Sequence, residues 1–393
     1  MGGLRGISRG LVFVKIAILA RLLSPSEFGL FGIATLSLAF LEIFTETGIN
    51  IFLVQEKEKI DKYLDSAWVI SIIRGILISG LLFLGSSVIS RFFDSENSVN
   101  LIRLIAVIPL IRGFINPSII KFQKNLEFNR EFWFRFTLSL VDVSVAITIG
   151  LITKNAIALV WGMLASAVLE VSLSFALLKP WPKFILNKIK AKRIINKGKW
   201  VTAAGIFNYL FQEGDDIIVG RLMSTASLGL YQVAYKISSL PITEIAQVVI
   251  KVTFPVYVKI SADKARLKQA FIKSVVAVTA LALPLGLILF FFTKPLVIVV
   301  LGENWLEVIP VIRLLSGFGV IRALTIITYP LLLSLNKQNY VSIITFVGIV
   351  GLAVTIVPLV LAKGIIGAGI SALIGASLAL PTSIYYVYKA LKK

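Results

Sequence analysis

The stretch Ala20-Arg21-Leu22-Leu23-Ser24-Pro25-Ser26-Glu27-Phe28-Gly29-Leu30-Phe31 decides the fold, because the chain contains it twice. It aligns without a gap on Gly220-Arg221-Leu222-Met223-Ser224-Thr225-Ala226-Ser227-Leu228-Gly229-Leu230-Tyr231. A second pair follows in the same order: Leu101-Ile102-Arg103-Leu104 with Ile111-Arg112 matches Val311-Ile312-Arg313-Leu314 with Ile321-Arg322. Two independent matches in register predict two halves of similar fold.

The composition places both halves in a membrane. Hydrophobic residues make up 57% of the chain and charged residues 15%, with a mean hydropathy of +0.92. Water-soluble proteins carry about 25% charged residues. The sequence therefore predicts a polytopic membrane protein, and duplicated halves built from apolar segments are typical of transporters.

Two residue types are missing, and their absence narrows the chemistry. The chain has neither Cys nor His. Thiol nucleophiles, disulfides, the usual zinc and haem ligands and imidazole acid–base chemistry are thereby excluded. We expect no catalytic residue, no metal site and no cofactor. The net charge of +20 resides mostly in short loops between apolar runs, which indicates membrane orientation and no nucleic-acid partner.

Twelve apolar runs approach the length of about 20 residues that crosses a bilayer. They are 4–19, 30–54, 68–89, 101–120, 132–152, 156–178, 201–220, 228–252, 275–300, 308–335, 341–361 and 365–387. A basic segment, 179–199, separates six runs from six. We predict an all-α membrane protein with two pseudo-symmetric six-helix bundles: an N-terminal lobe, 1–178, a cytoplasmic linker, 179–199, and a C-terminal lobe, 200–393.

Most Lys and Arg residues fall in the loops on the side that holds both termini and the linker. The positive-inside rule therefore predicts cytoplasmic termini in a multi-pass protein of the cell membrane. The loops on the other side are short, which leaves no room for an extracytoplasmic catalytic domain.

Many charged residues lie inside the predicted spans, where each costs about 2.5–3.5 kcal/mol on insertion scales. Helical spacing groups some of them into polar stripes. The stripes are Thr35, Glu42, Glu46 and Asn50; Asn208, Gln212 and Asp215; and Lys236, Ser239, Thr243 and Gln247. Such helices are stable around a hydrated cavity. For the single charges Arg74, Asp142 and Glu170, pairing between helices within a lobe is an equally good interpretation.

We assign roles within this predicted cavity by residue chemistry. Cations and amides suit an amphiphile with an anionic phosphate and a hydroxyl-rich head. The predicted substrate-binding residues are Lys15, Arg112, Lys236, Arg322, Asn208 and Gln212. The predicted sites for a coupling ion or proton are Glu42, Glu46 and Asp215.

Several of these segments resemble a known family, the polysaccharide flippases of the Wzx type within the multidrug/oligosaccharidyl-lipid/polysaccharide exporter superfamily. The resemblance is carried by 19–31, by Asp215-Asp216-Ile217-Ile218-Val219-Gly220-Arg221-Leu222 with the following 228–237, by Phe254-Pro255 and by Gly302-Glu303-Asn304-Trp305. It implies two six-helix lobes that alternate between inward- and outward-open states. It also implies a lipid-linked oligosaccharide substrate, with Asp215 at the family's intramembrane aspartate and Lys236 at its following basic residue. Asp216 stands where the family often has a neutral polar residue.

Three functions remain open at this point. The first is flipping of a polyprenyl-(pyro)phosphate-linked oligosaccharide for surface polysaccharide assembly, in contact with membrane lipids and with glycosyltransferases or a polymerase of the same pathway as partners. A drug or cation antiporter of the same fold would need an acidic cavity. An integral-membrane polymerase or ligase would need a large outer loop with catalytic acids. No Gly-x-x-x-x-Gly-Lys-Ser/Thr loop occurs, so energy is expected from an ion gradient, the membrane potential or product consumption.

Overall fold

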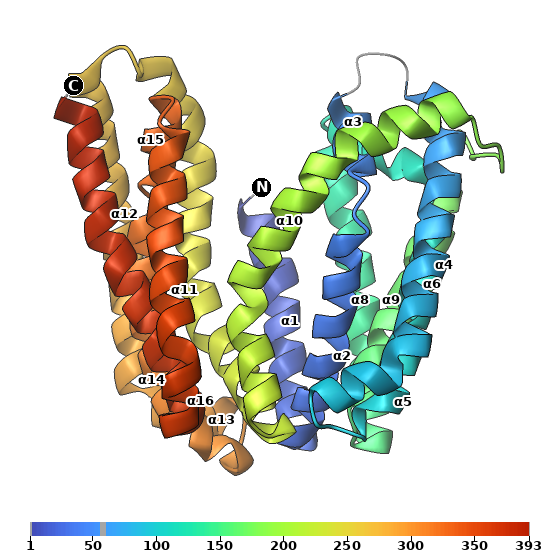
Figure 1. Ribbon diagram of the computed structural model, residues 1–393, viewed down its shortest axis with the longest axis horizontal. Helices are drawn as coiled ribbons and strands as arrows, with labels where there is room; N and C mark the ends of the chain where they lie inside the picture. The colour runs from blue at the N-terminus through green and yellow to red at the C-terminus, as the bar shows by residue number, and fades with distance from the viewer. Residues whose placement is uncertain (1, 56–59, 393) are drawn as a thin grey trace. The chain divides into compact units, whose positions relative to one another are not determined.

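The computed structural model describes residues 2–55 and 60–392, with side chains described outside 2–9, 51, 54–55, 193–204, 207–208 and 211. All regular elements in these ranges are helices (Figure 1). The chain divides into two compact units, unit 1 (Met1–Ile217) and unit 2 (Ile218–Lys393). This division falls inside a helix, so the predicted lobe boundaries around the 179–199 linker stay a prediction.

In its described residues, unit 1 has ten α-helices and one 3-10 helix, and the last α-helix runs on into unit 2. They are α1 (Gly2–Leu22), α2 (Pro25–Phe44), α3 (Ile49–Gln55), α4 (Asp61–Phe92), α5 (Ser98–Ile105), α6 (Val107–Gly113), η1 (Pro117–Ile120), α7 (Lys121–Lys124), α8 (Phe128–Thr153), α9 (Ile157–Leu177) and α10 (Lys188–Leu222). Unit 2 continues with α11 (Thr225–Ile260), α12 (Lys264–Phe291), α13 (Thr293–Val300), η2 (Glu303–Val308), α14 (Ile309–Ile326), α15 (Tyr329–Ser334) and α16 (Gln338–Lys392).

These helices confirm the predicted all-α membrane fold. Among the described residues, eight helical segments are long and apolar enough to cross a membrane, or nine if a bent pair counts as one span. The helices α1 and α10, which hold the first and seventh predicted spans, are outside that set and carry several charged residues. The helix α16 contains two predicted spans. The predicted twelve spans are consistent with this arrangement.

The last helix is a folded hairpin. Its 55 residues would extend about 80 Å if straight, far beyond the hydrocarbon core of about 30 Å. The chain reverses at Gly364, whose φ of 60° and ψ of −140° suit a residue without a side chain. The two arms then touch at glycines: a Cβ on Gly375 would lie 2.7 Å from the Gly348 carbonyl oxygen.

The repeat seen in the sequence recurs in three dimensions. Ser24 and Ser224 begin α2 and α11 with φ of −74° in both and ψ of 161° and 160°. Each hydroxyl accepts a hydrogen bond from the backbone amide three residues on, which satisfies one free donor of the helix. Arg103 lies over the Phe83 ring at 5.5 Å, and its counterpart Arg313 lies over Phe290 at 5.9 Å.

Two predicted spans are broken. In the second predicted span, α2 ends at Phe44 and α3 begins at Ile49. Between them Gly48 has a φ of 63°, and its amide donates to Glu46 Oε1 at 2.9 Å. The fourth bends by 75° between Ser98–Gly113 and Pro117–Lys124. At this bend Asn116 is fully buried. Its backbone amide donates a hydrogen bond to Ser174 Oγ at 3.0 Å. Both breaks place polar groups between helices.

Candidate functional site

Lys15 is paired with a carboxylate in unit 1. Its Nζ donates to both carboxylate oxygens of Asp142, at 2.9 and 2.7 Å, and so joins α1 to α8. Lys15 is only 8% exposed. On α9, Gly162 permits this arrangement, because a Cβ there would lie 2.7 Å from Asp142 Oδ1. An anionic ligand would have to compete with Asp142 for this ammonium group.

Arg74 on α4 closes the end of α2. Its Nη2 donates to the Glu42 carbonyl at 2.5 Å and to Glu46 Oε2 at 3.3 Å, and its Nε donates to Thr45 Oγ1 at 3.2 Å. A guanidinium group suits a helix C-terminus, where carbonyls lack intrahelical donors. The interpretation of Arg74 as a pairing residue between helices fits these contacts.

A second arginine approaches the same region from α6. Arg112 Nε lies 3.3 Å from Glu170 Oε2 on α9. The charges of Arg112, Arg74, Glu46 and Glu170 all act on the half-buried Glu42 carboxylate. We call these five residues the unit 1 charge cluster. It unites three predicted site residues, Glu42, Glu46 and Arg112, and it holds three carboxylates against two guanidinium groups.

The amide and acid predicted on α10 differ in exposure. Asp215 is 8% exposed and buried, whereas Gln212 is exposed. The side chain of Asn208 lies outside the described residues. Between these positions the Tyr209 hydroxyl donates to the Leu36 carbonyl at 2.8 Å, which fastens α10 to α2 within unit 1.

The predicted cations of unit 2 lie on α11 and α14. Arg322 Nη1 donates to the Tyr235 hydroxyl at 2.8 Å, and its guanidinium lies 5.5 Å from the Phe318 ring centroid. Tyr235 and Phe318 rings are 6.2 Å apart. Lys236 follows Tyr235 directly and is half-buried. Guanidinium groups bind both aromatic faces and phosphates, so these contacts of Arg322 are compatible with binding of an anionic ligand.

Sequence reasoning missed the two aromatic residues around Arg322. Phe318 precedes Arg322 by four positions, which is one helical turn, and Tyr235 precedes the predicted Lys236. An aromatic residue one turn from an intramembrane arginine is a usable signal for such a contact. The polar stripe after Lys236 serves packing in part, since Ser239 Oγ donates to the Leu315 carbonyl at 3.0 Å.

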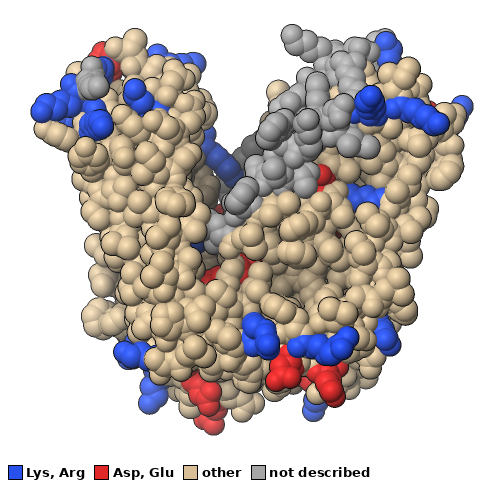
Figure 2. All heavy atoms as spheres, in the orientation of Figure 1, with Lys and Arg blue, Asp and Glu red and all other residues tan. Residues whose placement is uncertain are grey.

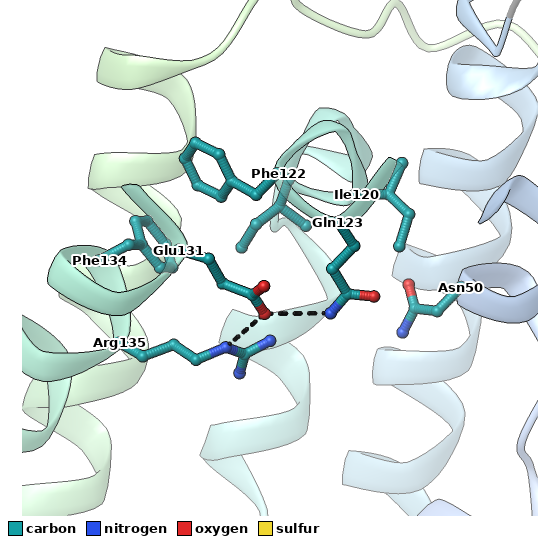
Figure 3. Close-up of a pocket in the computed structure, with 8 residues that line it drawn as sticks. Asn50, Ile120, Phe122, Gln123, Glu131, Phe134 and Arg135 are labelled. Carbon is teal, nitrogen blue, oxygen red and sulfur yellow. Dashed lines mark hydrogen bonds and ion pairs between the residues drawn. The ribbon is translucent and has the colours of Figure 1, made fainter. Parts of the chain in front are cut away.

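A small pocket of about 90 Å³ opens in unit 1 between α3, η1, α7 and α8 (Figure 3). Asn50, the last member of the predicted stripe 35–50, faces Gln123 across it (Figure 3). Glu131 Oε1 accepts from Gln123 Nε2 at 3.1 Å and from Arg135 Nε at 2.9 Å. The i, i+4 spacing of Glu131 and Arg135 could have indicated this pair from the sequence.

The described side chains contain no group of three Asp or Glu residues arranged to hold a metal ion.

Comparisons with known proteins identify relatives across most of the chain. A family model described as polysaccharide biosynthesis protein matches residues 18–310. An uncharacterized membrane protein in the cps region of Klebsiella pneumoniae is 27% identical over 96% of this chain and 78% of its own length. The teichuronic acid biosynthesis protein TuaB of Bacillus subtilis is 27% identical over 79% of this chain and 65% of its own length.

A third relative is the lipopolysaccharide biosynthesis protein WzxC of Escherichia coli, 24% identical over 80% of this chain and 64% of its own length. This chain thus spans about two thirds of the length of TuaB and WzxC. Among solved structures, lipid II flippase MurJ in an inward closed conformation has a TM-score of 0.78 at 16% identity, covering 99% of this chain and 88% of MurJ. An inward-facing multidrug resistance MATE transporter has a TM-score of 0.72 at 15% identity, covering 98% and 94%. At these identities the likeness concerns the fold.

Proposed function

This chain belongs to the polysaccharide biosynthesis protein family, and we propose that it flips a polyprenyl-(pyro)phosphate-linked oligosaccharide across the cytoplasmic membrane for surface polysaccharide assembly. The observation that carries this proposal is the family match over residues 18–310. The names of the relatives, which refer to teichuronic acid and lipopolysaccharide biosynthesis, support the substrate class. The MurJ-like fold supports the two-lobed mechanism of alternating access.

The charge pattern suggests how such a substrate is held. We propose that Arg322 and Lys236 bind the phosphate groups, because both carry a positive charge in unit 2 and Arg322 contacts the neutral aromatic side chains of Tyr235 and Phe318. Lys15 and Arg112 lie beside carboxylates, so they contribute when the substrate displaces those acids. Asn208 and Gln212 are proposed to bind sugar hydroxyls.

Energy coupling is assigned to the carboxylates. Within the unit 1 charge cluster, Arg74 contacts Glu46 and Arg112 contacts Glu170, which leaves Glu42 as the surplus acid. A carboxylate at bilayer depth is costly unless it is neutralised. We therefore propose Glu42, with Glu46 and Asp215, as sites for a proton or a coupling cation.

The same proposal covers the membrane topology of the protein and its partners in the pathway. Both termini lie in the cytoplasm, and the protein transports without catalysing a reaction. Glycosyltransferases that make the lipid-linked glycan act before it, and a polymerase acts after it.

A deletion strain tests the function. Loss of the gene should cause lipid-linked glycan to accumulate on the cytoplasmic side, and the wild-type gene should restore export. Lys236→Ala or Asp215→Ala should abolish export while protein level and membrane insertion stay normal, measured by immunoblotting of membranes and by surface glycan labelling. Normal surface glycan in either variant would remove that residue from the mechanism.

One observation favours a second function, the drug or cation antiporter. Carboxylates outnumber guanidinium groups in the unit 1 charge cluster, and an acidic lining suits cationic substrates. This function predicts that the deletion strain exports glycan normally but loses resistance to lipophilic cations, which growth assays would measure.

A further inference from the structure

One end of unit 2 is strongly basic. The buried residues Tyr257, Leu267, Leu331 and Ala390 share one core cluster, so the C-terminal end of α11, the N-terminal end of α12 and the last turn of α16 lie together there. The basic residues of these segments and of the turn before α16 are Lys259, Lys264, Arg266, Lys268, Lys273, Lys337, Lys389 and Lys392, and Asp263 is the single carboxylate among the described residues of the same segments. Figure 2 shows Lys and Arg side chains, drawn in blue, gathered at the end of unit 2 that carries the C-terminus.

Two of these lysines converge on one aromatic ring. Lys337 Nζ lies 5.8 Å and Lys389 Nζ 5.9 Å from the Tyr340 ring centroid, and Lys389 is also 5.9 Å from that of Tyr385. The reversal of α16 at Gly364 makes this meeting possible, because it returns the last turns of the helix to its first turn. Tyr386 packs against Tyr340, with the ring centroids 4.5 Å apart and the ring planes tilted by 32°.

Among the residues that the structure describes, the two ammonium groups have no countercharge. Both lysines are half-buried, and within the described residues neither side chain makes a hydrogen bond or an ion pair. Like charges held near one ring repel each other, and the ring quadrupole offsets only part of that cost. An anion between the two ammonium groups would remove the repulsion and form charge-assisted hydrogen bonds.

An apolar stripe leads along α16 to these lysines. Leu378, Pro381, Tyr385 and Tyr388 are exposed and follow one another at helical spacings of three and four residues. This stripe suits acyl chains, and tyrosines near lysines are typical of the membrane–water boundary. An anion with hydrocarbon tails would therefore match both parts of the surface.

We propose that Lys337, Lys389 and Tyr340 form a binding site for the phosphate headgroup of an anionic phospholipid, whose tails lie along the exposed stripe 378–388 of α16. The site is separate from the residues proposed to bind the transported substrate. Its occupant is a resident membrane lipid that neutralises the hairpin end of unit 2.

Native mass spectrometry of the full chain in detergent tests the proposal. Phosphatidylglycerol should bind the wild type, and phosphatidylcholine, which has no net charge, should bind much more weakly. Lys337→Ala/Lys389→Ala should weaken phosphatidylglycerol binding roughly 30-fold, the effect of two cations near an anionic headgroup. Lys337→Arg/Lys389→Arg should retain binding, because it keeps both charges.

Lys363→Ala is the matched control, since it removes an exposed lysine beside the reversal, at the opposite end of the hairpin, and should leave phosphatidylglycerol binding unchanged. A melting temperature and elution volume equal to those of wild type show that the double variant is folded. Unchanged phosphatidylglycerol binding in the folded double variant overturns the site. If glycerol phosphate displaces bound phosphatidylglycerol as well as free phosphatidylglycerol does, the site binds phosphate alone and the lipid proposal is overturned. If an acidic peptide binds in place of lipid, the surface is a protein-docking surface instead. Export activity is measured separately, so failure here leaves the proposed flippase function intact.

Discussion

Lys15 is held by one carboxylate from a different helix, and this pairing determines the effect of its substitution. Breaking a buried ion pair by removing one partner leaves an uncompensated charge and costs about 3–5 kcal/mol. We expect Lys15→Met or Asp142→Leu alone to lower the melting temperature of the purified protein markedly, because each leaves one charge of the pair without its partner.

The double variant Lys15→Met/Asp142→Leu separates structure from transport. It removes both charges and should recover most of the lost stability, which differential scanning fluorimetry would measure. Export by a stable double variant assigns Lys15 a purely structural role. A stable double variant that fails to export supports the proposed contact of Lys15 with substrate.

The sequence predicted which charged residues lie inside the spans, but not which side chains contact one another. Lys15 and Asp142 are 127 residues apart, and no spacing rule connects residues on different helices. The same holds for Arg112 and Glu170 and for Arg322 and Tyr235. Helical periodicity groups residues on one helix, whereas partners across helices depend on how the helices pack.

Among the elements, the α16 hairpin depends most directly on small residues. A Cβ on Gly375 would lie 2.7 Å from the Gly348 carbonyl oxygen, and the backbone cannot move away as a flexible side chain could. We expect Gly375→Val to separate the two arms and to destabilise the protein by about 1–3 kcal/mol, the usual cost of overpacking. Thermal unfolding in detergent would measure the loss.

Gly80→Ala is the control for this prediction. A Cβ on Gly80 in α4 would meet no atom within 4 Å. Replacing a glycine in a helix interior by alanine should therefore stabilise the protein by about 0.5–1 kcal/mol. A similar loss for both variants would contradict the hairpin contact.

Element boundaries were predictable where the backbone chemistry is local. The repeated stretch separates predicted spans in both copies, 4–19 from 30–54 and 201–220 from 228–252, and the structure has Ser24 and Ser224 as helix caps there. The break after Phe44 was missed, since the apolar run 30–54 continues across it. There the backbone turn at Gly48 and its bond to Glu46 override the hydrophobic pattern.

For the whole molecule, the orientation in the membrane is the prediction most open to experiment. The chain has no cysteine, so single cysteines can be introduced into the wild-type sequence. Asn97→Cys and Asn304→Cys should react with a membrane-impermeant maleimide on intact cells. Asn125→Cys and Ala262→Cys should react only after the membrane is opened, because the positive-inside rule places them in the cytoplasm.

All four positions are exposed in the structure, so a missing reaction reports the membrane and not burial. The reverse labelling pattern would contradict the predicted topology. Mixed labelling at one position would indicate two orientations of the protein in the cell.

The global organisation was the most predictable level. Composition and repeat predicted an all-α membrane protein, which the fold confirms, and the family resemblance is confirmed by the model match over residues 18–310. The stacking of Arg103 on Phe83 and of Arg313 on Phe290 extends the repeat to side-chain contacts.

The reversal of α16 at Gly364 also affects how the two arms of this helix insert into the membrane during synthesis. The final two spans are separated by a turn whose one charged group is Lys363. Insertion of these two spans carries only one charged side chain, that of Lys363, across the membrane with the two apolar arms. These two spans can therefore enter the bilayer together, as one hairpin, in a single step of biogenesis.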